Sequence, residues 1–270
     1  METGSEKTPA PVLFIPHGGG PLPLLGDKSH QELISFLKDI TTTLGKPSAI
    51  LIISAHWEAD EVTITSGNSP SLLYDYAGFP DAAYKIQYPV PGDSALADRI
   101  MRLLREHDVE ARLDDLRGFD HGVFVPLKIM YPEANIPCVQ LSLISTLDPA
   151  THIHLGKALS DLRNQNLLII GSGFSFHNLR AFRPGAVNTP DSGNEAFEQW
   201  LIDTCTNPDM PASEREKRLI TWENAPFARY CHPREEHLLP LHVCYGISGS
   251  TARLVFNGEV IGKRTSAFLW

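Results

Sequence analysis

Apolar runs and amphipathic segments alternate along most of this chain. Four runs have the length and continuous hydrophobicity of strands buried on both faces, at residues 11–15, 49–54, 136–144 and 166–172. Two segments between them, 30–44 and 93–107, carry apolar residues three or four positions apart and are predicted to be helices. A third helix is predicted over 148–162, because Asp148-Pro149 is typical of a cap followed by a proline in the first turn. The alternation predicts an α/β fold, in which helices flank a central mixed, largely parallel sheet.

The remaining segments fit a single domain. Residues 61–66 and 252–270 have strand character, and we expect them at antiparallel edges of the sheet. Residues 1–10 are predicted to be a flexible tail and residues 11–270 one domain. Within that domain, residues 184–224 are rich in proline, asparagine and charge, which indicates an insertion or cap with one or two helices.

Composition narrows the classes of partner. The net charge is −9 and there is no basic block, which argues against nucleic acid or an anionic membrane as the main partner. The first residues lack an apolar signal-peptide core, and no run approaches the roughly 20 apolar residues of a membrane span. The four cysteines are far apart and form no CxxC motif, so we expect reduced thiols and a cytoplasmic protein. Nothing in the sequence indicates a particular oligomeric state.

Three histidines closely follow predicted strands. His17 comes two residues after the first run, His56 two residues after the second, and His177 five residues after the fourth. Ligands of open α/β sheets bind at the carboxyl edge of the strands, because the loops splay apart there. One such histidine alone is best interpreted as a structural residue in a turn. Three of them at one edge predict an active site at the C-terminal edge of the sheet.

The stretch IPHGGGP around His17 allows three interpretations: a tight turn, the oxyanion loop of an esterase, or part of a metal site. The esterase would also need a nucleophile elbow, G-x-S-x-G, after a strand. The nearest match, Gly173-Phe-Ser-Phe-His177, ends in histidine where a glycine is needed, which argues against an esterase. Imidazole is a good ligand for zinc, iron and copper, and spacing alone does not choose among these metals.

A late cluster, CHPREEHLLPLH, offers further candidate ligands. If residues 236–246 are helical, His237 and His242 point roughly 140° apart and cannot share one metal. One histidine of this cluster is therefore expected to face the site, while the others, including His232, are expected to be capping or surface groups. Glu236 is a rival ligand beside His237.

The segment GFDHGVFVPL places His121 at the start of a predicted helix. The helix dipole disfavours a charged imidazolium there, so a neutral ring could donate or accept a hydrogen bond in the site. The structural alternative is a helix start at which Asp120 provides the cap. The other histidines are interpreted as ordinary helix or surface residues: His30, His107, His152 and His154.

The chain resembles the class III extradiol ring-cleaving dioxygenases, and within them the branch of DOPA 4,5-extradiol dioxygenases. The resemblance runs from about residue 11 to the C-terminus. It rests on eight motifs that occur in the same order: PHGGGP (16–21), SAHWE (54–58), YDYAGFP (74–80), YPVPGD (88–93), GFDHGVFVPL (118–127), PCVQLSL (137–143), GSGFSFHNLR (171–180) and EEHLLPL (235–241).

The resemblance implies one catalytic domain over 11–270 and a mononuclear non-haem metal site. Its ligands would be His17, His56 and a residue of the late helix, which is His237 in the DOPA-type branch and would be Glu236 in the protocatechuate type. His177 would be the acid/base residue and His121 a further catalytic histidine of the pocket. The implied cofactor is one divalent ion, Fe(II) for activity, with zinc possible in the purified protein. The substrates would be a DOPA-like catechol and O2.

Two alternatives on the same scaffold are a Memo-like protein, which binds a metal without ring cleavage, and a zinc-dependent enzyme. The presence of both His121 and His177 favours an enzyme. Tyr74, Phe79 and Tyr84 are candidates for aromatic pocket walls or for the packing of a long loop. Arg234 is either a partner for a substrate carboxylate or a surface residue paired with Glu235 or Glu236.

Overall fold

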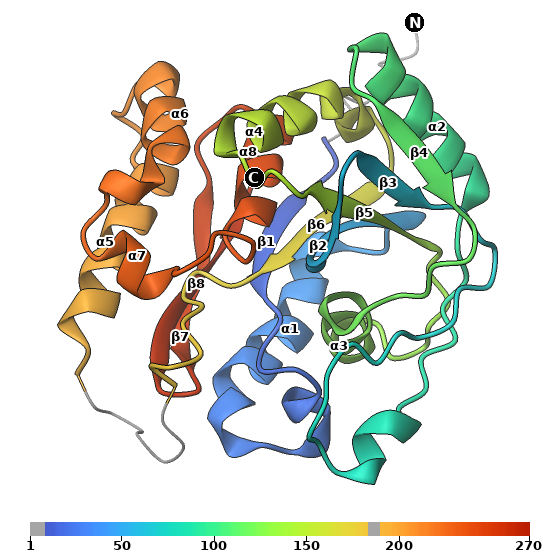
Figure 1. Cartoon of the computed structure of the whole chain (residues 1–270), viewed down its shortest axis with the longest axis horizontal. Helices are drawn as coiled ribbons and strands as arrows, with labels where there is room; N and C mark the ends of the chain where they lie inside the picture. Colours follow the sequence, from blue (N-terminus) through green and yellow to red (C-terminus); the bar gives the residue numbers. More distant parts are fainter. Residues whose placement is uncertain (1–8, 183–189) are drawn as a thin grey trace, which may run out of the picture.

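In the part of the chain that the structure describes, eight strands form one sheet (Figure 1). The structure is a computed structural model that describes residues 9–182 and 190–270. The strands are β1 (Val12–Pro16), β2 (Ala49–Ala59), β3 (Val62–Thr65), β4 (Ala111–Asp114), β5 (Cys138–Ile144), β6 (Leu167–Gly173), β7 (Arg253–Val260) and β8 (Lys263–Leu269). The α-helices are α1 (Gln31–Leu44), α2 (Ser94–Glu106), α3 (His121–Met130), α4 (Pro149–Ala158), α5 (Ser192–Thr206), α6 (Ala212–Ile220), α7 (Ala228–Cys231) and α8 (Leu239–Ser248).

The sheet order is β4-β3-β5-β2-β6-β1-β8-β7. Its centre is parallel, because β1 and β2 both pair with β6 and β2 also pairs with β5. The C-terminal hairpin β7–β8 adds antiparallel strands beside β1, and β3 runs antiparallel to β5. The predicted mixed, largely parallel sheet is confirmed. Strand β4 was not predicted, because its four partly exposed residues form no apolar run. It covers β3, which is therefore not the edge strand expected from segment 61–66.

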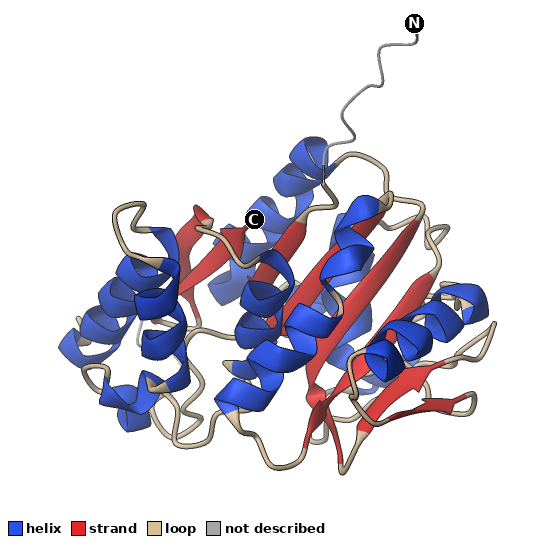
Figure 2. Cartoon of the chain, turned by 90° about the horizontal axis from the view of Figure 1, so that it is seen from above, coloured by secondary structure: helices blue, strands red, loops and turns tan. Residues whose placement is uncertain are grey.

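Helices cover both faces of the sheet (Figure 2). Strand β6 shows which helix covers which face, since neighbouring residues of a strand point to opposite faces of the sheet. Ser172 hydrogen-bonds the carbonyl of Gly122 in α3. A side chain at Gly171 would instead collide with Pro240 and Cys244 of α8. Helices α3 and α8 therefore sandwich the strand that separates β1 from β2, and the site lies at the carboxyl end of these three strands.

The predicted cap and tail are only partly described. Residues 184–189 of the cap and 1–8 of the tail lie outside the described residues. The rest of the cap contains helices α5 and α6, which pack against each other, and α5 also packs on β8. Ala10 is already buried, and its N–H donates to the carbonyl of Arg163. Among the described helices, none combines the length and the apolar character that a bilayer crossing requires.

Candidate metal centre

His17 and His56 meet at the carboxyl ends of β1 and β2, the two parallel strands on either side of β6. His17 directly follows β1, and its N–H extends the strand pairing by donating to the carbonyl of Gly173, 3.1 Å away. His56 lies within β2 rather than beyond it, because β2 continues to Ala59 through an irregularity in its pairing with β5. The Nε2 atoms of the two rings are 3.0 Å apart. The prediction that these histidines lie at one edge of the sheet is confirmed.

His237 reaches the same place from a turn, not from a helix. Helix α8 begins only at Leu239, since Pro240 occupies its first turn. The turn packs closely on β6: the N–H of Phe174 donates to the carbonyl of His237, 2.9 Å away. A Cβ atom at Gly173 would overlap that carbonyl oxygen. The glycine is therefore needed for the backbone contact that sets the position of His237.

One nitrogen from each of His17, His56 and His237 lies within 4.8 Å of the others, an arrangement that could hold a metal ion. With metal–nitrogen bonds of about 2.1 Å, two ligands are about 3.0 Å apart at right angles and about 3.4 Å apart in a tetrahedron. The 3.0 Å between the Nε2 atoms of His17 and His56 fits that range. The donor set therefore fits a divalent ion bound by three imidazoles.

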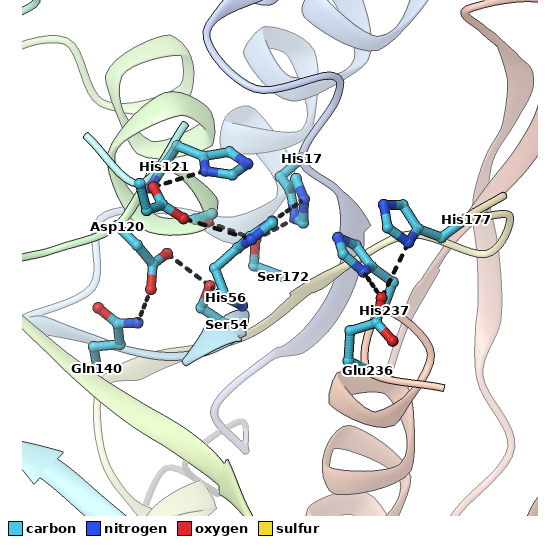
Figure 3. A network of polar contacts seen from close by, with 12 residues as sticks. His17, Ser54, His56, Asp120, His121, Gln140, Ser172, His177, Glu236 and His237 are labelled. Atoms are coloured by element: carbon cyan, nitrogen blue, oxygen red, sulfur yellow. Dashed lines mark hydrogen bonds and ion pairs between the residues drawn. The ribbon is translucent and has the colours of Figure 1, made fainter. Parts of the chain in front are cut away.

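The Nδ1 atoms of the three rings, which face away from the shared centre, also have partners (Figure 3). His17 Nδ1 is 3.2 Å from Ser172 Oγ, whose own proton goes to the carbonyl of Gly122. His237 Nδ1 is 2.8 Å from Glu236 Oε1, and His56 Nδ1 is 3.5 Å from Asp75 Oδ2. Acceptors behind metal-binding imidazoles fix the tautomer and orient the rings. The same pattern here leaves the inner nitrogens free for a metal.

The three candidate ligands are neutral at neutral pH. Burial, followed by repulsion from His237, lowers the pKa of His17 well below its usual value. Burial and the nearby His121 do the same for the pKa of His56. The pKa of His237 falls to about 3 because the ring is buried and stacked on His177. Neutral imidazole is the form that binds metals, so no proton has to be displaced.

His177 and His121 flank this trio on opposite sides. The ring of His177 stacks on His237 with centroids 3.3 Å apart, and its Nδ1 is 3.1 Å from Glu236 Oε1. The ring of His121 lies 3.8 Å from that of His56. The structure thus brings together all five histidines that the sequence analysis assigned to the site.

The carboxylate of Glu236, the rival ligand, lies behind the rings of His237 and His177 rather than with His17 and His56 (Figure 3). Burial alone would raise its pKa. Hydrogen bonds from His177 and His237 instead hold the pKa of this carboxyl below its ordinary value, so it is ionised. The geometry favours His237 as the third metal-binding residue, with Glu236 as its hydrogen-bond acceptor.

Helix α3 is not capped by Asp120, contrary to the structural alternative for this segment. The side chain of Asp120 makes no capping bond and instead accepts from Ser54 and Gln140 in the buried core. Asp75 takes over the role from a distant loop. Its Oδ1 accepts from the N–H of His121 at 3.0 Å and lies 2.8 Å from Nδ1 of the same residue.

Two expectations for the other histidines are wrong. His232 and His242 are fully buried, and each contacts a backbone carbonyl, that of Ser175 and that of Leu219 respectively. They are core residues, not capping or surface groups. His30 is more than an ordinary helix residue, since its Nε2 accepts the N–H of Gly19 at 2.9 Å and so holds the glycine loop that follows His17.

The histidines open into a cavity of about 400 Å³ with mostly apolar walls. Its walls include Leu22, Tyr76, Phe79, Phe174 and Phe182. Of the three aromatic candidates, Phe79 lines the cavity, whereas the rings of Tyr74 and Tyr84 pack against that of Tyr76 and do not line it. Gly18, Gly19 and Gly20 form another part of the wall, and Gly18 adopts φ +87°, where a side chain would also meet Pro23.

Two further sequence hypotheses can be compared with this cavity. Arg234 is half-exposed, and its guanidinium pairs with both carboxylate oxygens of Glu58 at 2.5 Å and lies 3.5 Å from Glu236 Oε2. It is therefore a surface residue paired with Glu236, as one of the two interpretations expected, with Glu58 as an additional partner. Ser175 is buried and lies 2.8 Å from the hydroxyl of Thr265. A serine held there cannot act as a nucleophile in the cavity, which agrees with the argument against an esterase.

Comparison with known proteins agrees with this geometry. Residues 11–268 match the family described as the catalytic LigB subunit of aromatic ring-opening dioxygenase. A 4,5-DOPA dioxygenase extradiol from Beta vulgaris is 36% identical over 258 residues, covering 94% of this chain and 93% of that protein. The dioxygenase tasH from Hapsidospora irregularis is 36% identical over 278 residues, covering 97% of this chain and 85% of that protein.

A solved structure shares the whole fold. The crystal structure of an uncharacterised protein from Escherichia coli K12 superposes with a TM-score of 0.77 at 29% identity, covering 96% of this chain and 99% of the other. The family match and the relatives named as dioxygenases speak for an enzyme rather than the Memo-like binding protein. The chain belongs to the LigB family and is an extradiol, aromatic ring-opening dioxygenase.

Proposed function

We propose that this enzyme cleaves a catechol beside its diol with the help of one Fe(II) ion held by His17, His56 and His237. The observation that carries the proposal is the convergence of these three neutral imidazoles, flanked by two more histidines, on the floor of an apolar cavity. Because several relatives carry the name 4,5-DOPA dioxygenase, DOPA is the first substrate to test.

Fe(II) is the proposed ion because a mononuclear site with histidine ligands and open positions suits iron-dependent oxygenases. When bound, the ion would supply the redox chemistry and the Lewis acidity that join O2 to the ring. Zinc binds such sites more tightly than Fe(II), so the purified protein could carry zinc without being a zinc enzyme.

The protein's own groups would bind the ring and move its protons. His177 and His121 both line the cavity, and their Nδ1 atoms contact carboxylates. Their Nε2 atoms are therefore available to accept protons from the two catechol hydroxyls. The aromatic and aliphatic walls would bury the ring and keep water from the reaction. The product would be a muconic semialdehyde.

The cellular setting is part of the proposal. A cytoplasmic location is supported by the four cysteines, all of them free and buried. The net charge of −9 supports a small-molecule substrate rather than nucleic acid or an anionic membrane. The helices of the predicted cap, α5 and α6, would remain part of the one catalytic domain.

Oxygen consumption tests this function. The metal-free protein is reconstituted with Fe(II) without oxygen and then mixed with oxygenated DOPA or unsubstituted catechol. We expect uptake of one O2 per substrate, together with the visible absorbance of a semialdehyde. His17→Ala, treated identically, should show neither, because it lacks a metal ligand. Equal activity of His17→Ala, or full activity with zinc alone, would contradict the proposal.

A further inference from the structure

Two carboxylates each contact two histidines of the cavity. Asp75 uses both oxygens: Oδ1 lies 2.8 Å from His121 Nδ1 and Oδ2 lies 3.5 Å from His56 Nδ1. Glu236 uses one: Oε1 lies 2.8 Å from His237 Nδ1 and 3.1 Å from His177 Nδ1. Each carboxylate thus joins one proposed metal ligand to one proposed acid/base residue.

These contacts dictate where the ring protons are. An ionised carboxylate can only accept, so the nitrogen facing it must carry the proton. Asp75 Oδ1 also accepts the backbone N–H of His121, 3.0 Å away, so this oxygen acts as an acceptor toward His121. All four rings are therefore held with Nδ1 protonated and with the lone pair of Nε2 directed to the cavity side. A metal ligand and a proton acceptor need the same tautomer, and one carboxylate provides it for both.

We propose that Asp75 and Glu236 are a matched pair of positioning residues, each of which fixes the tautomer of one metal-binding and one proton-accepting histidine. The assignment of the two histidine roles rests on the proposed function. Each of the two catechol protons would then have its own histidine–carboxylate receiver, His121 with Asp75 and His177 with Glu236. A proton gained at Nε2 would be stabilised by the carboxylate at Nδ1.

Asp75 contacts its two histidines through both carboxylate oxygens, whereas Glu236 contacts both of its histidines through one. Replacing each carboxylate by an amide should therefore have different effects on metal binding. In Asp75→Asn, the amide oxygen can still accept both bonds from His121, but the NH2 group then faces His56 Nδ1. Two donors cannot pair, so His56 must move its proton to Nε2, where it competes with the metal. In Glu236→Gln, one amide oxygen can still accept from both rings. Its NH2 group would face Arg234, which keeps Glu58 as a partner.

Metal affinity tests the inference without any turnover. The dissociation constant for Co(II) is measured by competition with a chelating dye. We expect Asp75→Asn and Glu236→Ala to bind about 10–100-fold more weakly than the wild type, and Glu236→Gln to lose less than about tenfold. Glu198→Gln is the matched control, because it removes a buried carboxyl that is bonded to Ser266, away from the cavity. Its affinity should equal that of the wild type. Asp75→Asn binding as tightly as this control would overturn the inference.

Tautomers can also be observed directly. Two-bond 1H–15N spectra of the zinc-loaded protein, labelled on histidine, distinguish Nδ1–H from Nε2–H rings. We expect the Nδ1–H pattern for His121 and His177 in the wild type and its loss for His177 in Glu236→Ala. An Nε2–H pattern for either ring in the wild type would overturn the inference. The affinity ranking could hold even in a chain that cleaves no catechol, so failure of the proposed function is distinguishable. If the enzyme cleaves catechol but its variants do not show the expected order of Co(II) affinities, only the inference about Asp75 and Glu236 is refuted and the proposed function stands.

Discussion

His177 is the residue at which metal binding and catalysis should separate most clearly. It stacks on His237 but contacts Glu236 through Nδ1, so it is not needed to complete the trio of metal-binding nitrogens. We expect His177→Ala to keep one equivalent of metal while kcat falls about 10²–10⁴-fold, the usual cost of removing a general base. Metal analysis and steady-state kinetics measure the two effects.

The exposed His107 provides the control for that change. His107→Ala should match the wild type in both metal content and kcat. If His177→Ala instead lost its metal, the trio would be misassigned. If it kept near-normal turnover, the proton-accepting role would belong to His121.

Among the single residues of the site, the sequence revealed the histidines but not the residues that orient them. The five histidines could be found because each stands in a short motif next to a predicted strand or helix. Ser172 and Asp75 could not, because their roles arise only from folding: Ser172 is 155 residues from His17, and Asp75 is 46 residues from His121. An aspartate within the aromatic segment YDYAGFP was the one available signal for Asp75.

Among the elements, the contact of β6 with the turn before α8 should be the most sensitive to a small change. In Gly173→Ala the new methyl group would overlap the carbonyl of His237, so the turn has to shift. We expect a loss of about 1–3 kcal/mol in the free energy of unfolding, as is typical of overpacking. Metal affinity should fall as well, because His237 moves with the turn.

Denaturant unfolding and Co(II) titration of Gly173→Ala measure these two quantities. We expect the free energy of unfolding and the Co(II) affinity to fall together. A variant that unfolds earlier but binds Co(II) as tightly as the wild type would show that this contact does not set the position of His237.

The sequence predicted the central elements better than their ends. The four apolar runs became β1, β2, β5 and β6, since continuous burial on both faces leaves a clear pattern. The last part of β2 escaped prediction because its irregular pairing breaks the alternation of side chains. The late helix was predicted to begin too early. The apolar spacing of EEHLLPL is helix-like, and only Pro240 signals that the helix starts after His237.

Glu198 should make the free energy of unfolding of the whole molecule depend on pH. Burial raises the pKa of this carboxyl to about 7. Between roughly pH 4.5 and 7 the unfolded chain loses the proton while the folded chain keeps it, so stability falls as the pH rises. The loss from this group is at most about 3 kcal/mol, since one pKa unit corresponds to about 1.4 kcal/mol.

Glu198→Gln carries no such proton and should lack this loss. Urea unfolding from pH 4.5 to 8 measures the free energy of unfolding of both proteins. The stability of the wild type should fall relative to that of Glu198→Gln up to about pH 7, and the difference should then stay constant. A constant difference over that range would show that Glu198 titrates normally.

A ring-opening dioxygenase of this kind inserts both atoms of one O2 molecule into the catechol that it cleaves. The most direct measurement is the mass of the product formed by the Fe(II)-loaded enzyme from catechol under 18O2. We expect a ring-opened product that carries both 18O atoms before exchange with water, and no product from His17→Ala. An intact ring, or a product with a single 18O atom at the earliest time points, would contradict this expectation.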